Sequence, residues 1–213
     1  MIDVLDHTEA VRQPAVVEAM YRLRYRVFKE RLKWSVSTED GLERDDFDEH
    51  QPVYLMAMND REHLVGTWRM LPTTGSYMLR DVFPMLLGGT EAPCDPSIWE
   101  GSRFAIDCQY QGRSGLAALN DVTAEIFCAV VEFAMANGID EVMTVYDIRI
   151  ARLLARIGCR PKWRGPIVQI EETRTMAGRF DANADVLAEI RHKNGIQGSV
   201  IRTAPWLVHQ HAA

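Results

Sequence analysis

The sequence predicts an α/β protein of the α+β kind, with a mixed, largely antiparallel central sheet flanked by helices. Strand patterns follow one another in the N-terminal half, whereas strands and helices alternate in the C-terminal half. That order places helices on the faces of a mixed sheet. The chain has neither a Gly-x-Gly-x-x-Gly nor a Gly-x-x-x-x-Gly-Lys motif, so a dinucleotide-binding fold is not expected.

The elements of the N-terminal half are predicted from apolar spacing and turn residues. Pro14 suits the first turn of a helix, where a missing N–H costs nothing, and apolar residues then recur at helical spacing. Pro84 breaks a later, shorter helix. In chain order we expect a strand over 2–5, a helix from Pro14 to about Lys33, a structured loop over 34–51, strands over 53–58 and 63–71, and a short helix over 79–87.

The C-terminal half is predicted in the same way. Gly138 and Gly158 each follow a helical pattern, and glycine is typical of the left-handed residue that ends a helix. In chain order we expect a central strand over 98–106, a helix from Leu116 to Asn137-Gly138, a strand over 141–146, a helix over 148–157, a strand over 167–171 and a helix over 181–192.

Composition limits the class of function. The 213 residues are expected to form one domain over 1–213, and the net charge of −6 argues against nucleic-acid binding, which usually shows a basic footprint. The chain lacks a basic leader and any stretch near the ~20 apolar residues of a membrane span. The cysteines lack metal-ligand spacing and suit a reducing compartment. We therefore expect a cytoplasmic protein with no metal and no membrane partner.

Charges gather in two neighbouring segments. Residues 22–33 are mostly basic and residues 39–49 mostly acidic, which would also suit a surface helix and loop that complement each other. Arg24 and Phe28 share a helix face that includes apolar neighbours. An arginine on a buried face needs a partner, and three acids can supply one. These acids are Asp45, Asp48 and Glu100, with Arg69 and Arg103 extending an alternating network.

The residue order resembles that of the acyl-homoserine lactone synthases, the LuxI-type autoinducer synthases. The matching positions are Arg24, Phe28, Trp34, Asp45, Asp48, Arg69, Glu100, Arg103 and Phe104. The resemblance extends over roughly 24–158, and Gly101 departs from it where many members carry a larger residue. It implies an acetyltransferase-like (GNAT-related) αβα sandwich.

The resemblance also implies a reaction. The amine of S-adenosylmethionine attacks an acyl thioester on acyl carrier protein, an acidic partner, and the methionine carboxylate then closes the lactone and releases 5′-methylthioadenosine. S-Adenosylmethionine is consumed as a substrate, so no cofactor is implied. A sulfonium cation is attracted to aromatic faces, which suits Phe28 and Trp34.

Site roles follow from that chemistry. Glu100 is the first candidate for the base that frees the amine, ahead of Asp48 and Glu43, although it could instead position Arg24 or Arg103. Backbone N–H groups at a bulge over 103–106 could bind the oxyanion. Arg103 is grouped with the catalytic acids. The residues expected to bind S-adenosylmethionine are Arg24, Phe28, Trp34, Asp45, Arg69 and Phe104.

Two further surfaces are expected. The acyl pocket is assigned to Thr144, Met143 and Leu153. Thr144 stands where members of the resembled family that use 3-oxo chains tend to have threonine, so the resemblance favours a 3-oxo chain. Six basic residues against Asp147 give residues 147–164 a charge of +5. Arg149, Arg152 and Arg156 form a helical stripe that could dock the carrier or could simply be solvated.

Two other functions stay open. An N-acyltransferase that uses acyl-coenzyme A would need a pyrophosphate-binding loop before a helix, and residues 111–117 (Gln-Gly-Arg-Ser-Gly-Leu-Ala) partly meet that description. A non-catalytic module would bind S-adenosylmethionine without consuming it.

Overall fold

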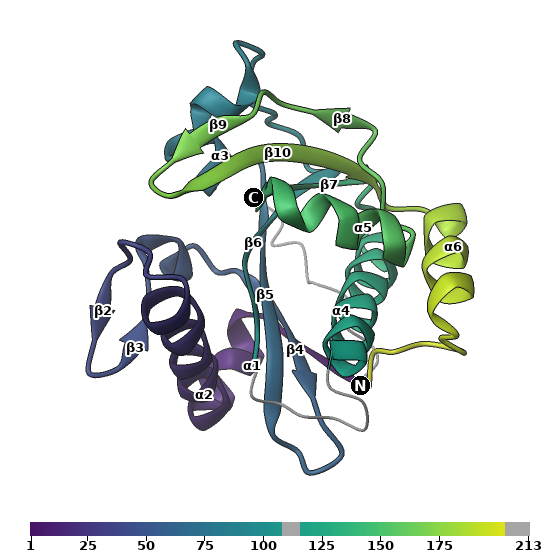
Figure 1. Cartoon of the computed structure of the whole chain (residues 1–213). Coiled ribbons are helices and arrows are strands. Elements are labelled where there is room, and N and C mark those ends of the chain that lie inside the picture. The colour runs from purple at the N-terminus through teal and green to yellow at the C-terminus, as the bar shows by residue number, and fades with distance from the viewer. Residues whose placement is uncertain (108–115, 203–213) are drawn as a thin grey trace.

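The computed structural model describes residues 1–107 and 116–202, with side chains placed for 1–107 and 121–202. Its main sheet has the strand order β1-β4-β5-β6-β7-β10-β8, with β9 paired to β10 (Figure 1). The strands are β1 (Ile2–Leu5), β4 (Val53–Met58), β5 (Leu64–Pro72), β6 (Ile98–Ile106), β7 (Glu141–Asp147), β8 (Trp163–Arg164), β9 (Val168–Ile170) and β10 (Thr173–Asp181). A separate hairpin pairs β2 (Thr38–Glu39) with β3 (Leu42–Glu43).

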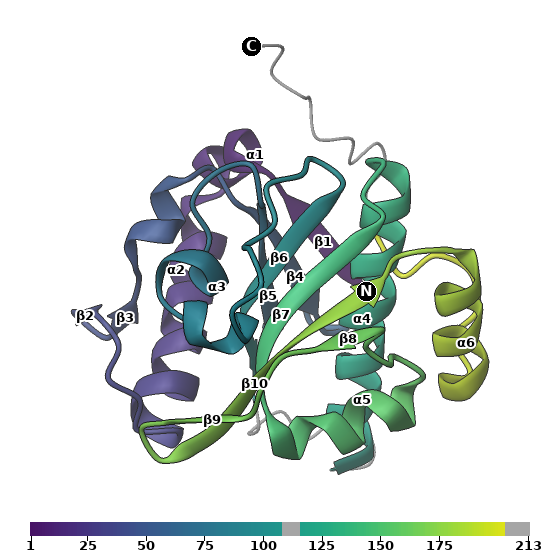
Figure 2. The ribbon, with the colours of Figure 1, turned by 90° about the horizontal axis from the view of Figure 1, so that it is seen from above.

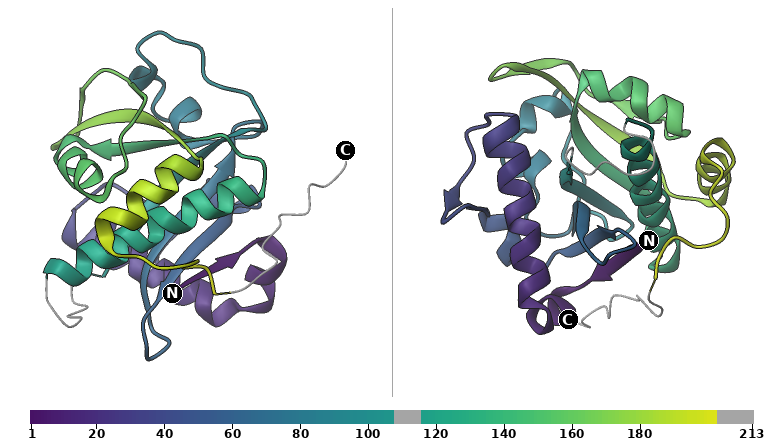
Figure 3. Two further views of the ribbon diagram at one scale, coloured as in Figure 1. Left: turned by 90° about the vertical axis from the view of Figure 1, so that its right-hand side faces the viewer. Right: turned by 60° about the horizontal axis from the view of Figure 1, so that its bottom comes forward.

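Helices cover both faces of the sheet. Helix α2 lies on one side, and α4 with α6 on the other (Figure 2); α6 packs along α4 (Figure 3). The α-helices are α1 (His7–Arg12), α2 (Pro14–Arg24), α3 (Met78–Asp81), α4 (Leu116–Ala136), α5 (Ala151–Ile157) and α6 (Ala184–Asn194). Short helical segments of other types are η1 (Tyr25–Arg31), η2 (Asp46–Glu49), η3 (Pro84–Leu87) and η4 (Ile148–Ile150).

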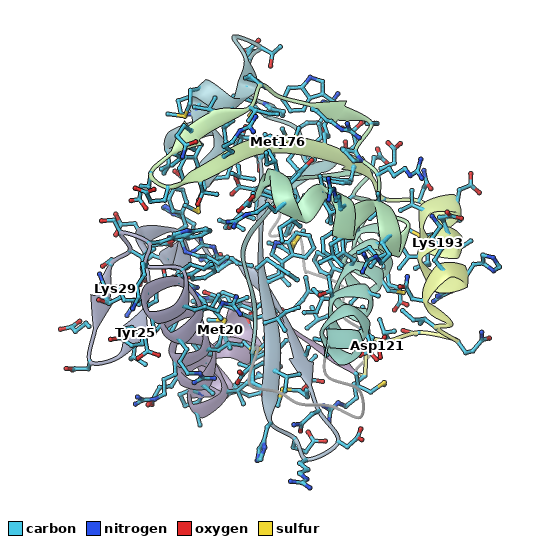
Figure 4. All side chains as sticks on the ribbon, viewed as in Figure 1. Met20, Tyr25, Lys29, Asp121, Met176 and Lys193 are labelled. Carbon is cyan, nitrogen blue, oxygen red and sulfur yellow. The ribbon has the colours of Figure 1, made fainter. Side chains whose placement is uncertain are left out.

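Helix α2 begins at Pro14, as the sequence predicts, and buries Met20, Leu23 and Arg24 toward the sheet. Figure 4 shows Met20 on the sheet side and Lys29 on the outer side. From Tyr25 the helix widens into the π-helical segment η1, which buries Val27 and Phe28. Helical widening of this kind occurs often at functional sites.

The only parallel pairing between strands of the described sheet joins β6 to β7, and it is short. It runs from the pair Ile98–Glu141 to the pair Gly101–Thr144. Beyond Gly101, β6 stays with β5 and β7 stays with β10. The two strands therefore part in the middle of the sheet, and a space opens between them.

A bulge on β6 lies where that space opens. Thr67 of β5 pairs with Ala105, but Arg69 pairs with Ser102, so two residues of β6 face Trp68 alone. One of the two, Arg103, has a left-handed φ of 57°. An extra residue of this kind redirects side chains and ends pairing. The predicted bulge is confirmed.

The predicted mixed sheet is confirmed, and the strands over 2–5, 53–58 and 98–106 have the expected bounds. Strand β10 and helix α1 are not predicted by the sequence pattern, and the last helix begins at Ala184 and not at the predicted residue 181. Strand β10 was missed because polar residues and Gly178 interrupt its apolar pattern. That glycine is required by packing: a Cβ there would lie 2.9 Å from the ring of Tyr146.

No helix in the described part of the chain is long and apolar enough to span a membrane. The main core lies between the sheet and α4. Gly66 of β5 lets the two approach closely, because a Cβ at this position would lie only 2.8 Å from Ile126 of α4.

A buried acid joins α4 to the segment that completes the sheet edge. Glu132 accepts hydrogen bonds from Arg191, the Ser199 hydroxyl and the Val200 N–H, and Ile201 bridges to Ile2. We expect Glu132→Ala to lower the free energy of unfolding by about 2 kcal/mol, because buried donors lose their acceptor. Urea denaturation measures this. Glu125→Ala, on the more exposed side of the same helix, should have a much smaller effect, and equal effects would contradict the assignment.

Candidate active site

Three arginines and three acids alternate in a closed ring of ion pairs, called here the ion ring. In order around it they are Arg24, Glu43, Arg103, Asp45, Arg69, Asp48 and again Arg24. The members come from α2, β3, η2 with its N-cap, β5 and β6. Opposite charges are equal in number, so the ion ring is neutral as a unit.

Arg24 has both sides of its guanidinium occupied. Its Nε donates to Glu43 Oε2 at 2.5 Å, and its two terminal nitrogens donate to Asp48 at 2.8 and 2.9 Å. Burial by itself lowers the pKa of Arg24, but Asp48 and Glu43 outweigh it and hold the pKa above its usual value. For Asp48, burial by itself raises the pKa, but Arg24 and Arg69 outweigh burial and hold the pKa of Asp48 below the usual range. These groups stay charged.

The other two arginines close the ion ring. Arg69 donates to Asp45 at 2.5 Å and to Asp48 at 2.9 Å. Arg103 donates to Glu43 at 2.9 Å and contacts Asp45 at 2.7 Å. The left-handed backbone at Arg103 therefore turns this side chain toward the ion ring.

A cavity of about 730 Å³ opens where β6 and β7 part. At one end, the rings of Phe28 and Trp34 stack with centroids 5.2 Å apart, and the Arg103 guanidinium lies 5.6 Å from the Phe28 ring. Another part of the wall is apolar, with packed rings of Trp68, Phe104 and Phe127. All these residues line the cavity. It therefore combines a polar, ring-walled part with an apolar part.

Glu100 also lines the cavity but lies outside the ion ring. Its two oxygens accept the backbone N–H groups of Met78 at 2.9 Å and Leu79 at 2.6 Å. Burial raises the pKa of Glu100 to about 7, although those N–H groups and the nearby arginines favour the anion. A carboxyl group with such a pKa can exchange a proton near neutral pH.

The Met78 sulfur sits against two arginines. It accepts from Arg69 at 3.3 Å and from Arg103 at 3.2 Å. Met78 thus links the helix that binds Glu100 to the ion ring.

The structure brings the predicted site residues together in two layers. Phe28, Trp34, Glu100, Arg103 and Phe104 line the cavity. Arg24, Glu43, Asp45, Asp48 and Arg69 lie behind that wall and do not line it. The side chains of Glu43 and Asp48 are 0% exposed, and their oxygens accept hydrogen bonds from arginines and other donors.

Of the three residues predicted for the acyl pocket, one lines the cavity and two do not. Thr144 lines the cavity, but Met143 packs in the core on the other side of the sheet. Leu153 does not line it either, whereas Leu154 does. Arg149 lies at the cavity rim bound to Asp147.

Several cavity residues were not predicted, among them Trp68, Met78, Phe127, Tyr146 and Ile150. Trp68 adjoins the predicted Arg69, and strand alternation gave no reason to place both near one site. Gly101 explains the closeness of Trp68, since a Cβ there would come within 2.7 Å of the indole. Of the loop proposed for pyrophosphate, residues 111–115 lie outside the described chain. Within 1–107 and 116–202, no group of three or more His, Cys, Asp or Glu side chains could hold a metal.

Comparisons with known proteins agree with this geometry. A family model for autoinducer synthases matches residues 8–190. An acyl-homoserine-lactone synthase of Pseudomonas aeruginosa is 40% identical over 167 residues, which cover 78% of this chain and 82% of the relative.

Solved structures are also similar. The AHL synthase LasI superposes with a TM-score of 0.80 at 35% identity, covering 90% of this chain and 94% of that chain. BjaI, a CoA-dependent acyl-homoserine lactone synthase solved with SAM and isopentyl-CoA, gives a TM-score of 0.82 at 28% identity and covers 95% and 92%. A putative N-acetyltransferase from Lactobacillus plantarum shares the fold, with a TM-score of 0.56 at 14% identity over 85% of this chain and 99% of that chain.

The family match identifies the chain as an acyltransferase, and its fold is acetyltransferase-like, as the sequence resemblance implied. The chain belongs to the autoinducer synthase family, and it is an acyl-homoserine-lactone synthase that makes a quorum-sensing signal from S-adenosylmethionine.

We expect Glu43→Gln to lower the free energy of unfolding by about 3–5 kcal/mol, because Arg24 and Arg103 lose a buried counter-ion. Chemical denaturation measures this. Glu49→Gln is the matched control, since Glu49 pairs with Arg44 on the surface. If both variants unfold at the same denaturant concentration, the ion ring does not stabilise the fold.

Proposed function

We propose that the enzyme transfers an acyl chain from acyl carrier protein to the amine of S-adenosylmethionine and then closes the lactone. The observation that carries this proposal is the cavity with two chemically different parts. Stacked Phe28 and Trp34 suit a sulfonium cation, since aromatic faces attract cations. The apolar part suits an acyl chain. The substrates place the enzyme in the cytoplasm.

Arg103 is proposed to bind the methionine carboxylate. It belongs to the ion ring and also lines the cavity, and its side chain is 12% exposed. A guanidinium can bind a carboxylate through two parallel hydrogen bonds. Arg24, Asp45 and Arg69 would then act from behind by fixing the position of Arg103. Glu43 and Asp48 share this positioning role. We prefer it to the role of base, for which they are candidates after Glu100 by sequence.

Glu100 is proposed to take the proton from the attacking amine. An α-amino group has a reference pKa of about 7.7–8.0, so a carboxylate with a pKa of about 7 is well matched to it. Each Glu100 oxygen uses one lone pair on a backbone N–H and retains another. The amine then attacks the thioester carbon, the thiol of the donor leaves, and an amide forms.

Two features of the protein support the later steps. The bulge at Arg103 and Phe104 adjoins the cavity, and backbone N–H groups at this position can stabilise the oxyanion of the tetrahedral intermediate. Lactone closure joins a carboxylate and an electrophilic carbon of one molecule, so correct folding of the methionine part supplies much of the rate. Thr144 lines the cavity and could donate to an oxygen at C3.

Carrier protein is favoured as the donor by the charge beside the cavity. Arg149 is 78% exposed at the rim, and Arg152 and Arg156 are exposed on α5. Acidic carriers are attracted to such a surface. Coenzyme A is the second candidate, because BjaI is CoA-dependent and covers nearly the whole chain.

We expect kcat/KM to fall below about pH 7, because protonated Glu100 cannot accept a proton. Glu100→Gln should lose most activity, and its remaining activity should lack that acidic limb. Release of 5′-methylthioadenosine across a pH series measures both. Ordinary turnover with an unchanged profile in Glu100→Gln would exclude the base role.

We expect methylthioadenosine release to be at least about tenfold more efficient with carrier-bound than with coenzyme A-bound donors of one chain length. Arg152→Glu with Arg156→Glu should raise KM for the carrier-bound donor and leave KM for S-adenosylmethionine unchanged. Lys193→Glu, on α6, reverses one charge on another surface and is the charge-matched control for each single substitution, Arg152→Glu or Arg156→Glu. Equal efficiency with coenzyme A, or an unaffected carrier KM, would contradict carrier docking on α5.

A further inference from the structure

A second, smaller cavity lies beside the main one. Its volume is about 310 Å³, and it is bordered by α5 and the chain that follows this helix. Of the side chains that the structure describes, only that of Tyr146 lines both cavities. One aromatic ring therefore stands at the boundary of the two spaces.

The segment around α5 borders both cavities with different residues. Ile150 and Leu154, four residues apart, line the main cavity. Ala151 and Ala155, the next residue in each case, line the small one. Small side chains on the second face leave the space that a larger residue would fill. Burial raises the pKa of Cys159 in the same wall to about 12, so its thiol is neutral.

Tyr146 is held firmly in its place. It is 9% exposed and belongs to β7, where it pairs with Met176 of β10. Its ring lies over Gly178, where a Cβ would come within 2.9 Å of it, and it packs near the Phe180 ring with centroids 6.2 Å apart. A ring enclosed in this way is a fixed wall.

We propose that Tyr146 is the partition that limits the length of the acyl chain. The inference rests on the proposed function only in that the acyl chain occupies the main cavity, and it is independent of the donor that carries the chain. Without the ring, the small cavity becomes an extension of the acyl site. Acyl chains at least two carbons longer than the native one would then fit.

The test is the ratio of kcat/KM for a long donor to that for the native donor. In Tyr146→Ala, we expect this ratio to rise about tenfold for a chain two carbons longer, because each methylene removed from water contributes about fourfold. Tyr146→Phe keeps the ring and should keep the wild-type ratio.

A back-filling variant provides a sharper control. Ala155→Leu alone occupies part of the small cavity and should leave turnover of the native donor unchanged. Combined with Tyr146→Ala, it should reduce the gain for long chains. If Tyr146→Ala does not fold, Tyr146→Leu opens part of the same space. The length limit can also be measured without an acyl donor, by calorimetric titration of each variant with N-acyl-homoserine lactones of increasing chain length.

The outcomes separate the two proposals. If carrier-bound donors fail and coenzyme A donors react, the donor proposal is wrong and the same ratio is measured with coenzyme A. If Tyr146→Ala or Tyr146→Leu keeps the wild-type length limit in both turnover and binding, the partition is wrong. A gain that Ala155→Leu leaves undiminished would also overturn it, because the extra length would then lie elsewhere.

Discussion

The site depends on the closure of the ion ring. Removing six charges from water is costly, and each pair offsets that cost only when its geometry is good. Arg24, Arg69 and Arg103 each divide their donors between two acids, so no charge of the ring is left unpaired. This requires α2, the loop with β3 and η2, and strands β5 and β6 to take their places together. The ion ring thereby fixes the cavity wall that it supports.

The divergence of β6 and β7 creates the cavity beside the ion ring. A sheet that stayed paired would leave no space at its centre, but here the parallel pairing ends at Gly101 and Thr144. The bulge that follows uses one left-handed residue, Arg103, to join the ion ring to the cavity. A bulge is a feature that proteins place next to active sites. The left-handed backbone at Arg103 thus places one side chain both in the ion ring and at the cavity wall.

Much of the frame could be predicted from sequence, because apolar spacing and turn residues act locally. The members of the ion ring were found by residue type and order, but their pairing was not: Glu100 was considered a partner for Arg24, yet it binds the N–H groups of Met78 and Leu79. Of the predicted acyl pocket, Thr144 lines the cavity, whereas Met143 and Leu153 do not. Both faces of β7 border the cavity from Thr144 onward, whereas Met143 lies where β7 is still paired with Glu100 of β6. Only the tertiary fold decides where the two strands part.

The two kinds of buried carboxylate show how one site separates support from chemistry. Asp48 is held as an anion by two arginines, so its pKa lies below the usual range and it cannot take a proton at neutral pH. Glu100 is equally buried, but its direct partners are neutral backbone N–H groups. Desolvation therefore dominates and raises its pKa to about 7. Because charge partners and not burial distinguish the two, moving one guanidinium nearer to Glu100 would turn the proposed base into another structural anion.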